Sequence, residues 1–228
     1  MAGRQARTAG LGAVAAVSLS DVAAPGLRVT GAFHPQPGDD VPEDFATLVM
    51  LGPSEDFWAV LTAAPEFGAP DPVDRWSERV VGAMAKDLGG QAFLPFGGPP
   101  YAPFLRWALR TGRAWSSPVG MLVHDTTGLM VSYRGAIAVR DRLKIPPPGP
   151  RPCDGCDRPC LSACPVGALG TDGYDTDACH RYLDTPAGSA CLSGGCLARR
   201  VCPASAGAAR AAAQSAHHMA YFHPKETV

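Results

Sequence analysis

The sequence predicts an α+β protein in which an α/β sandwich is followed by a small cysteine-rich module. Residues 1–145 alternate short apolar runs with helical patterns and end in two adjacent strands, which favours a sandwich with a mixed sheet. All eight cysteines lie after residue 152. The proline-rich stretch from Lys144 to Pro150 is typical of a stiff linker between the two parts. We therefore expect two domains, residues 1–145 and residues 146–228.

The first domain contains the elements of a layered fold. Strands are expected over residues 27–34, 46–51 and 91–94, because each is a short apolar run beside turn residues. The clearest helix has Asp71 as its N-cap and Pro72 at its first position, and it ends at Gly89-Gly90. Shorter helices are expected after Gly52-Pro53-Ser54 and around residues 104–111. Residues 119–125 and 129–139 are predicted strands joined by a hairpin-like turn, and residues 205–223 favour a helix that packs back across the protein.

Composition excludes several classes of protein. The net charge is −1 and 46% of the residues are hydrophobic, so no basic excess indicates a nucleic-acid partner. No apolar span is long enough for a membrane helix. The chain has no P-loop, no G-x-S-x-G and no strand-associated G-x-G-x-x-G, which argues against a nucleotide-dependent hydrolase. Near the N-terminus, Leu11, Val14 and Val17 predict an amphipathic helix rather than a signal peptide, so we expect a cytoplasmic protein.

The first cysteine group has the spacing of an iron–sulfur motif. Cys153, Cys156, Cys160 and Cys164 are followed directly by Pro165. This is close to the C-x2-C-x2-C-x3-C-P run of bacterial ferredoxins, with one additional residue between the second and third cysteines. Three nearby cysteines can enclose one face of a [4Fe-4S] cubane, while the fourth points toward a second cluster.

The second group is looser but also ends in Cys-Pro, and it consists of Cys179, Cys191, Cys196 and Cys202. Eight thiolates match the needs of two cubanes. By the same reasoning, the first cluster would be held by Cys153, Cys156, Cys160 and Cys202. The second would be held by Cys164, Cys179, Cys191 and Cys196. Structural zinc and a disulfide scaffold are the alternatives, since C-x2-C is also a zinc spacing; the two Cys-Pro endings favour iron–sulfur.

A glycine–proline loop at residues 96–104 is a candidate ligand site. Gly97 and Gly98 would let the backbone approach a flat ligand, with Tyr101 and Phe104 against it. The alternative is a tight turn between strand and helix. The roles of the histidines are also left open by the sequence. His34 and His124 end predicted strands, and His180 follows a ligand cysteine. The last helix carries His217, His218 and His223.

The order of these parts resembles a corrinoid-dependent reductase group. Its members are epoxyqueuosine reductase, the reductive dehalogenases and the protein that decyanates and dealkylates incoming vitamin B12. LVHDTTGLMVSYRGAIAV (residues 122–139) is similar to a hairpin of this group, and DPVDRWSERVVGAMAKDLG (residues 71–89) is similar to a helix of the B12-processing protein. CPVGAL (residues 164–169) and DACHRYL (residues 177–183) resemble CPTGAL and RCISYL of epoxyqueuosine reductase.

The resemblance implies a reduced nitroreductase-like fold for the first domain, a ferredoxin-like module after it, and cobalamin between them. The candidate pocket residues are Gly97, Gly98, Tyr101, His124, Tyr133 and Arg134. The segment R-Y-A-x-G-x-D-Y-H and the C-terminal repeats of epoxyqueuosine reductase have no counterpart, so tRNA modification is not expected. CLARRVCP (residues 196–203) also lacks that family's middle cysteine, and Cys191 is the candidate substitute; otherwise the second cluster would be labile or held by three cysteines.

Three functions follow from these patterns. The first is a cytoplasmic two-cluster protein that passes single electrons to a cobalamin-type corrinoid or another flat redox partner. The second is a ferredoxin-type carrier whose first domain docks a protein partner. The third is a zinc-binding structural module.

Overall fold

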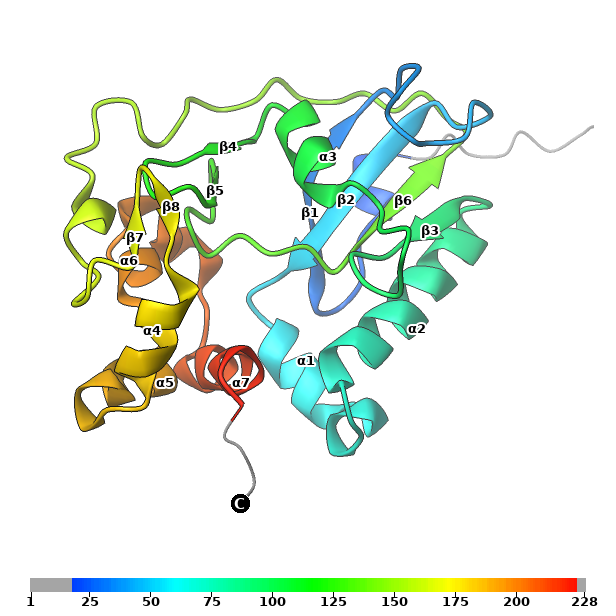
Figure 1. The fold of residues 1–228 in the computed structure, drawn as a ribbon. Helices are drawn as coiled ribbons and strands as arrows, with labels where there is room; N and C mark the ends of the chain where they lie inside the picture. The colour runs from blue at the N-terminus through cyan, green and yellow to red at the C-terminus, as the bar shows by residue number, and fades with distance from the viewer. Residues whose placement is uncertain (1–17, 225–228) are drawn as a thin grey trace, which may run out of the picture.

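A four-stranded sheet forms the centre of residues 27–139 in the computed structural model, which describes residues 18–224 (Figure 1). Its order is β1 (Leu27–Phe33), β2 (Thr47–Pro53), β6 (Gly135–Val139) and β3 (Gln91–Phe93). Every neighbouring pair is antiparallel, so the predicted mixed sheet is wrong. The reason is that β6 lies between β2 and β3 and runs opposite to both. The chain is α+β, with helices and strands in both halves.

The remaining elements are short, apart from two helices. The helices are α1 (Phe57–Ala63), α2 (Pro72–Asp87), α3 (Phe104–Arg110), α4 (Thr176–Leu183), α5 (Ser189–Gly194), α6 (Leu197–Arg200) and α7 (Ala212–Phe222). Two small ribbons pair β4 (Ala114–Ser116) with β5 (Leu122–His124) and β7 (Leu169–Gly170) with β8 (Gly173–Tyr174). Turns of 3-10 helix are η1 (Leu19–Asp21), η2 (Pro65–Gly68), η3 (Pro159–Leu161), η4 (Pro186–Gly188) and η5 (Pro203–Ala208).

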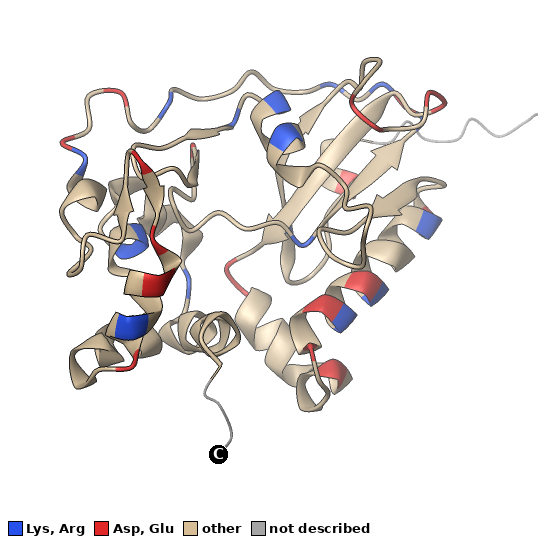
Figure 2. Ribbon diagram, in the orientation of Figure 1, with Lys and Arg blue, Asp and Glu red and all other residues tan. Residues whose placement is uncertain are grey.

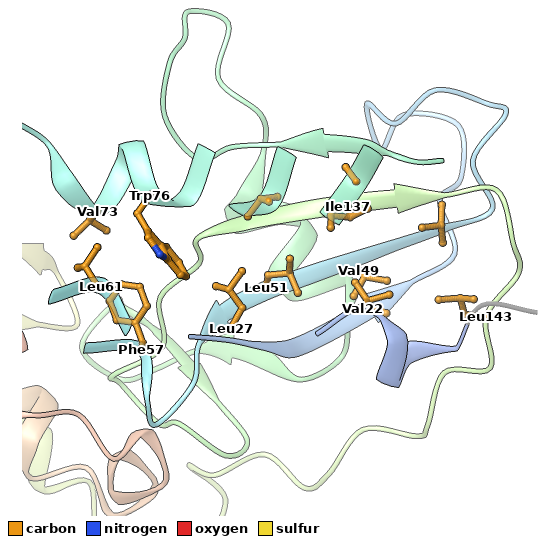
Figure 3. Close-up of a cluster of buried hydrophobic side chains, with 14 residues drawn as sticks. Val22, Leu27, Val49, Leu51, Phe57, Leu61, Val73, Trp76, Ile137 and Leu143 are labelled. Carbon is orange, nitrogen blue, oxygen red and sulfur yellow. The ribbon is translucent and has the colours of Figure 1, made fainter. Parts of the chain in front are cut away.

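Both faces of the central sheet are apolar and covered by helices. Along β2, Val49 and Leu51 point to one face, where Trp76 of α2 and Phe57 of α1 pack (Figure 3). Leu48 and Met50 point to the other face, together with Phe104 and Trp107 of α3. Side chains alternate between faces along a strand, so an unbroken apolar run such as β2 supplies a core on each side. Burial of these two clusters holds the first half together.

The helix predicted after Asp71 is present as α2, with Pro72 as its first residue. Its start differs from the expectation in one respect. Asp71 has a φ of 50° and its side chain makes no capping hydrogen bond. The helix is instead fixed by its buried stripe, which includes Val73, Trp76 and Val81.

The predicted hairpin over residues 119–139 is wrong. β5 pairs with β4, whereas β6 pairs with β2 and β3 in the main sheet. Residues 125–134 between them form no named strand, so the predicted strand at 129–139 is reduced to Gly135–Val139. This segment packs against the chain that follows Cys202, where Arg210 donates a hydrogen bond to the Met130 carbonyl at 3.0 Å. The local pairing is limited to one antiparallel bridge between His124 and Gly128, and contacts with distant residues hold the rest of the segment.

The linker runs along the edge of the molecule from β6 to the cysteine region (Figure 1). The chain then returns through α7, which lies beside α1. His217 of α7 stacks against Trp58 and Phe67 with ring centroids 5.3 Å and 6.0 Å apart. Neither α1 nor α7 carries a formal charge (Figure 2). The expected packing of the last helix across the protein is thus confirmed.

Two further sequence expectations concern the ends of the chain and membranes. The predicted amphipathic helix containing Leu11, Val14 and Val17 lies outside the described residues. Within residues 18–224, no helix has the length and apolar character needed to cross a membrane.

Candidate functional site

The first hollow is bordered by four cysteines from two separate stretches. Cys153, Cys156 and Cys160 come from one tight loop, and Cys202 comes from the start of η5. Together they border a space of about 490 Å³. The loop folds back because Gly155 and Arg158 adopt left-handed φ values of 74° and 54°. Glycine takes this conformation without strain, whereas an arginine there is held by its surroundings.

The wall of the first hollow belongs to the first half of the chain. Ser117, Pro118, Val123 and Leu129 line it beside the cysteines. Val123 and Leu129 share one buried cluster with Cys160 and Ala198. The hydroxyl of Ser117 is buried and has no hydrogen-bond partner among the described residues. An unpaired buried hydroxyl is costly, so this group is available to a sulfide or thiolate in the hollow.

The second hollow contains the other four cysteines on four different elements. Cys164 precedes β7, Cys179 lies in α4, Cys191 in α5 and Cys196 at the N-cap of α6. The space measures about 200 Å³ and is closed by α7 and by Met121 and Met130. The four-cysteine sets expected from the sequence are therefore the sets that the fold brings together. Their role as cluster ligands stays a prediction.

Backbone amides point at two of the cysteine sulfurs. The Arg158 amide donates to Cys156 Sγ at 3.4 Å, and the Ala168 amide donates to Cys164 Sγ at 3.3 Å. Burial raises the pKa of the Cys160 and Cys191 thiols, and also those of Cys153 and Cys179. Without a bound cation these thiols stay protonated at neutral pH. A metal centre would supply the positive charge that thiolates need, and the amides would stabilise them.

The second hollow is also bordered by two arginines and by one histidine that is neutral at neutral pH. Arg199, Arg210 and His218 line it. Burial, followed by the nearby charges of Arg199 and Arg134, lowers the pKa of Arg210 to about 10. Burial also lowers the pKa of His218 to about 3, with Arg210 as the next cause. Within residues 18–224, neither arginine lies within ion-pair distance of a carboxylate. This region therefore favours negative charge in the hollow.

The six candidate pocket residues do not form one pocket. Tyr101 is 65% exposed and Gly97 is exposed as well, while Gly98 lies in the same loop. Tyr133 packs near the Phe104 ring at 6.3 Å. The Nε of Arg134 is buried without a partner. None of the six lines either cysteine hollow.

His124 is buried and hydrogen-bonded within the fold, and it does not face a cysteine hollow. It is 1% exposed, and its Nε2 lies 2.6 Å from the Thr30 carbonyl oxygen. The Thr126 amide donates to Nδ1 at 3.2 Å, which requires the neutral tautomer with its proton on Nε2. Burial lowers the pKa of His124, in agreement with this tautomer. The side chain ties β1 to the turn after β5.

The other histidines occupy three different settings. His34 Nδ1 lies 2.9 Å from the Ala46 carbonyl oxygen, so it closes the end of the sheet. His180 and His223 face each other with their Nδ1 atoms 2.6 Å apart, and His223 Nε2 lies 2.9 Å from Asp184. Of the six histidines in the chain, only His218 lines a cysteine hollow.

Sequence reasoning missed the groups that complete the hollows. Arg199 and Arg210 carried no motif, although Arg199 stands three residues after Cys196. Ser117 and Met121 lie more than 30 residues before the first cysteine, and no local pattern connects them to it. Comparison of the chain with protein-family models, with curated proteins and with solved structures finds no match. The site must therefore be interpreted from its own geometry.

Proposed function

We propose that this protein is an electron-transfer protein that holds two [4Fe-4S] clusters, one in each cysteine hollow. The observation that carries the proposal is the division of the eight cysteines into two sets of four, with no cysteine shared. Each set supplies the complete cysteine ligation that such a cluster takes. The unpartnered Ser117 hydroxyl and the amides aimed at sulfur support the fit.

When bound, such clusters supply reversible one-electron chemistry. The protein's own residues would then perform three tasks. The cysteines hold each cluster, and Cys191 serves as the fourth ligand of the second. Leu129, Met121 and Met130 cover the hollows with apolar surface that limits contact with water. Arg199, Arg210 and His218 surround the second hollow and stabilise negative charge there.

A zinc module is the weaker proposal. Zinc needs four ligand atoms about 2.0–2.3 Å from a single centre. The thiols here border hollows of about 490 Å³ and about 200 Å³, which suits a larger inorganic group. Within the described residues, no set of three or more His, Cys, Asp or Glu side chains is arranged to hold a metal ion, and this finding does not separate zinc from iron.

The fold family of each part, the cellular location and the electron acceptor are also part of the proposal. The two-cluster region would be a ferredoxin-like module in a cytoplasmic protein, and the helix-covered sheet a reduced nitroreductase-like domain. A corrinoid as the electron acceptor rests on the resemblance alone, because its six candidate residues do not form one pocket. A protein partner that receives the electrons is the function we favour for the first half.

The test is anaerobic purification followed by chemical analysis and spectroscopy. We expect roughly eight irons and roughly eight acid-labile sulfides per chain, a broad visible absorbance, and its bleaching by dithionite. A colourless protein with bound zinc and no labile sulfide would overturn the proposal. Hydroxocobalamin added to the reduced protein then separates the acceptors. Faster formation of a protein-bound cob(II)alamin spectrum than in a protein-free control would restore the corrinoid.

A further inference from the structure

A small polar hollow lies apart from both cysteine sets, where the C-terminal part of the chain packs against the sheet. Its walls come from β1, from the segment after β5, and from the start of α7. Its polar side chains are Arg28, Arg210, Gln214, Thr127, Thr30 and Ser132. No cysteine lines it, so its occupant would not contact a cluster ligand. Arg210 also borders the second cysteine hollow.

Three of these side chains present buried groups without a partner. They are Nε of Arg28, Nε2 of Gln214 and the hydroxyl of Thr127. Gln214 is 4% exposed and Thr127 is 3% exposed, so neither can turn to bulk water. Leaving one such donor unpaired costs about 1–3 kcal/mol. Three unpaired donors around one hollow require a bound molecule or ion that accepts hydrogen bonds.

Three acceptors beside the hollow are already engaged by donors of its own walls. Arg210 Nη2 donates to the Met130 carbonyl at 3.0 Å and to Ser132 Oγ at 3.2 Å. The Thr30 hydroxyl donates to the Met50 carbonyl at 3.0 Å. A water molecule would bring two protons of its own and only two acceptor positions. An anion, which only accepts, matches this surplus of donors better.

The charges around the hollow also favour an anion. Arg28 and Arg210 both carry positive charge into the hollow, and neither has a carboxylate within ion-pair distance in residues 18–224. Glu55 is the acidic neighbour of Arg28, and Arg113 adds another cation. The nearest charges around Arg210 are Arg199 and Arg134. The positive charge of Arg210 thus has only cations as its nearest charges, and a bound anion would stabilise it.

The size of the hollow selects the anion. Its volume of about 10 Å³ corresponds to one guest of roughly the size of a water molecule. Phosphate, sulfate and carboxylates are too large. We propose that Arg28, Arg210, Gln214 and Thr127 form a halide site, with chloride as the physiological occupant, that fastens the C-terminal segment to the sheet.

The direct test uses crystals of the cluster-loaded protein soaked in bromide, with diffraction collected at the bromine absorption edge. We expect an anomalous peak between Arg28 and Gln214. Electron density for a water molecule with no anomalous signal at that place would overturn the proposal. Because iron is located at its own edge, absence of iron would disprove the proposed clusters without affecting this result.

Solution measurements show whether the halide binds outside a crystal. Thermal unfolding is compared in potassium chloride and in potassium gluconate of equal concentration, since gluconate is too large to enter. We expect the apparent Tm to be about 2–4 °C higher in chloride. Equal values in the two salts would contradict a halide site that is occupied in solution.

Two variants show where the effect arises. Gln214→Glu replaces the donating amide nitrogen with a carboxylate oxygen that repels a halide, so the difference between the salts should disappear while the protein stays folded. Arg142→Gln removes an exposed arginine elsewhere on the surface and should keep the full difference. A chloride effect that persists in Gln214→Glu would overturn the assignment.

Discussion

The two cysteine hollows differ in construction and in charge, although each has four thiols. Three cysteines of the first hollow come from one short loop, so its shape follows largely from local backbone conformation. The cysteines of the second hollow lie on four elements, and α7 closes it from a distance. A ligand set spread in this way depends on the packing of α4, α5 and α6.

Charge separates the hollows more clearly than geometry does. Asp154, Asp157 and Arg158 line the first hollow, whereas Arg199, Arg210 and His218 line the second without any carboxylate. A cluster surrounded by cations is easier to reduce, because the added negative charge is stabilised. If each hollow holds a cluster as proposed, we expect an electron to come to rest in the second hollow.

Removal of one ligand from each set should have the largest effect. We expect Cys160→Ser and Cys191→Ser each to reduce the iron content from roughly eight to roughly four atoms per chain, because each belongs to only one hollow. Iron and sulfide analysis measures this directly. Ser193→Ala, on the same helix as Cys191, should keep the full content. Loss of all iron in either variant would show that the two hollows are not independent.

Gly207→Ala should damage the first hollow selectively. A Cβ at this position would lie 1.9 Å from the Thr126 carbonyl oxygen, so η5 could not remain docked beside Cys202. We expect a loss of about 1–3 kcal/mol of stability and of the first cluster's signal. Denaturant unfolding and electron paramagnetic resonance give the two readouts.

The control for this change is Gly82→Ala in α2, where nothing lies within 4 Å of the added Cβ. It should leave the iron content unchanged and stabilise the helix slightly. Full retention of both clusters in Gly207→Ala would contradict the close approach of these two segments.

The smallest expected effect is on reduction potential. Arg199→Gln should lower the potential of the second cluster on the order of tens of millivolts, because one nearby positive charge is removed. The first cluster should be unaffected. Arg200→Gln removes an exposed charge from the same helix and should change neither potential. A redox titration followed by electron paramagnetic resonance resolves the two clusters. Equal shifts of both would remove the distinction between the hollows.

The sequence predicted well where a pattern is local. The buried run at β2, the helix after Asp71 and the first cysteine group were each recognisable from neighbouring residues alone. It failed for residues 119–139, where alternation suggested a hairpin. There β5 pairs with β4, the strand just before it, whereas β6 pairs with the distant β2 and β3, and pairing over such separations leaves no trace in a short window.

The same limit applies to the site. Cysteine spacing predicted the two sets of four thiols, but only Cys153, Cys156 and Cys160 are brought together by one short loop, which has little freedom in how it encloses a guest. The tertiary structure alone decided what surrounds them. It brought Ser117 to the first hollow, and Arg199 and Arg210 to the second, from positions that no motif connects. Ser117 and Arg210 are separated in sequence from the cysteines whose hollows they line, so their contribution is determined only when the chain has packed.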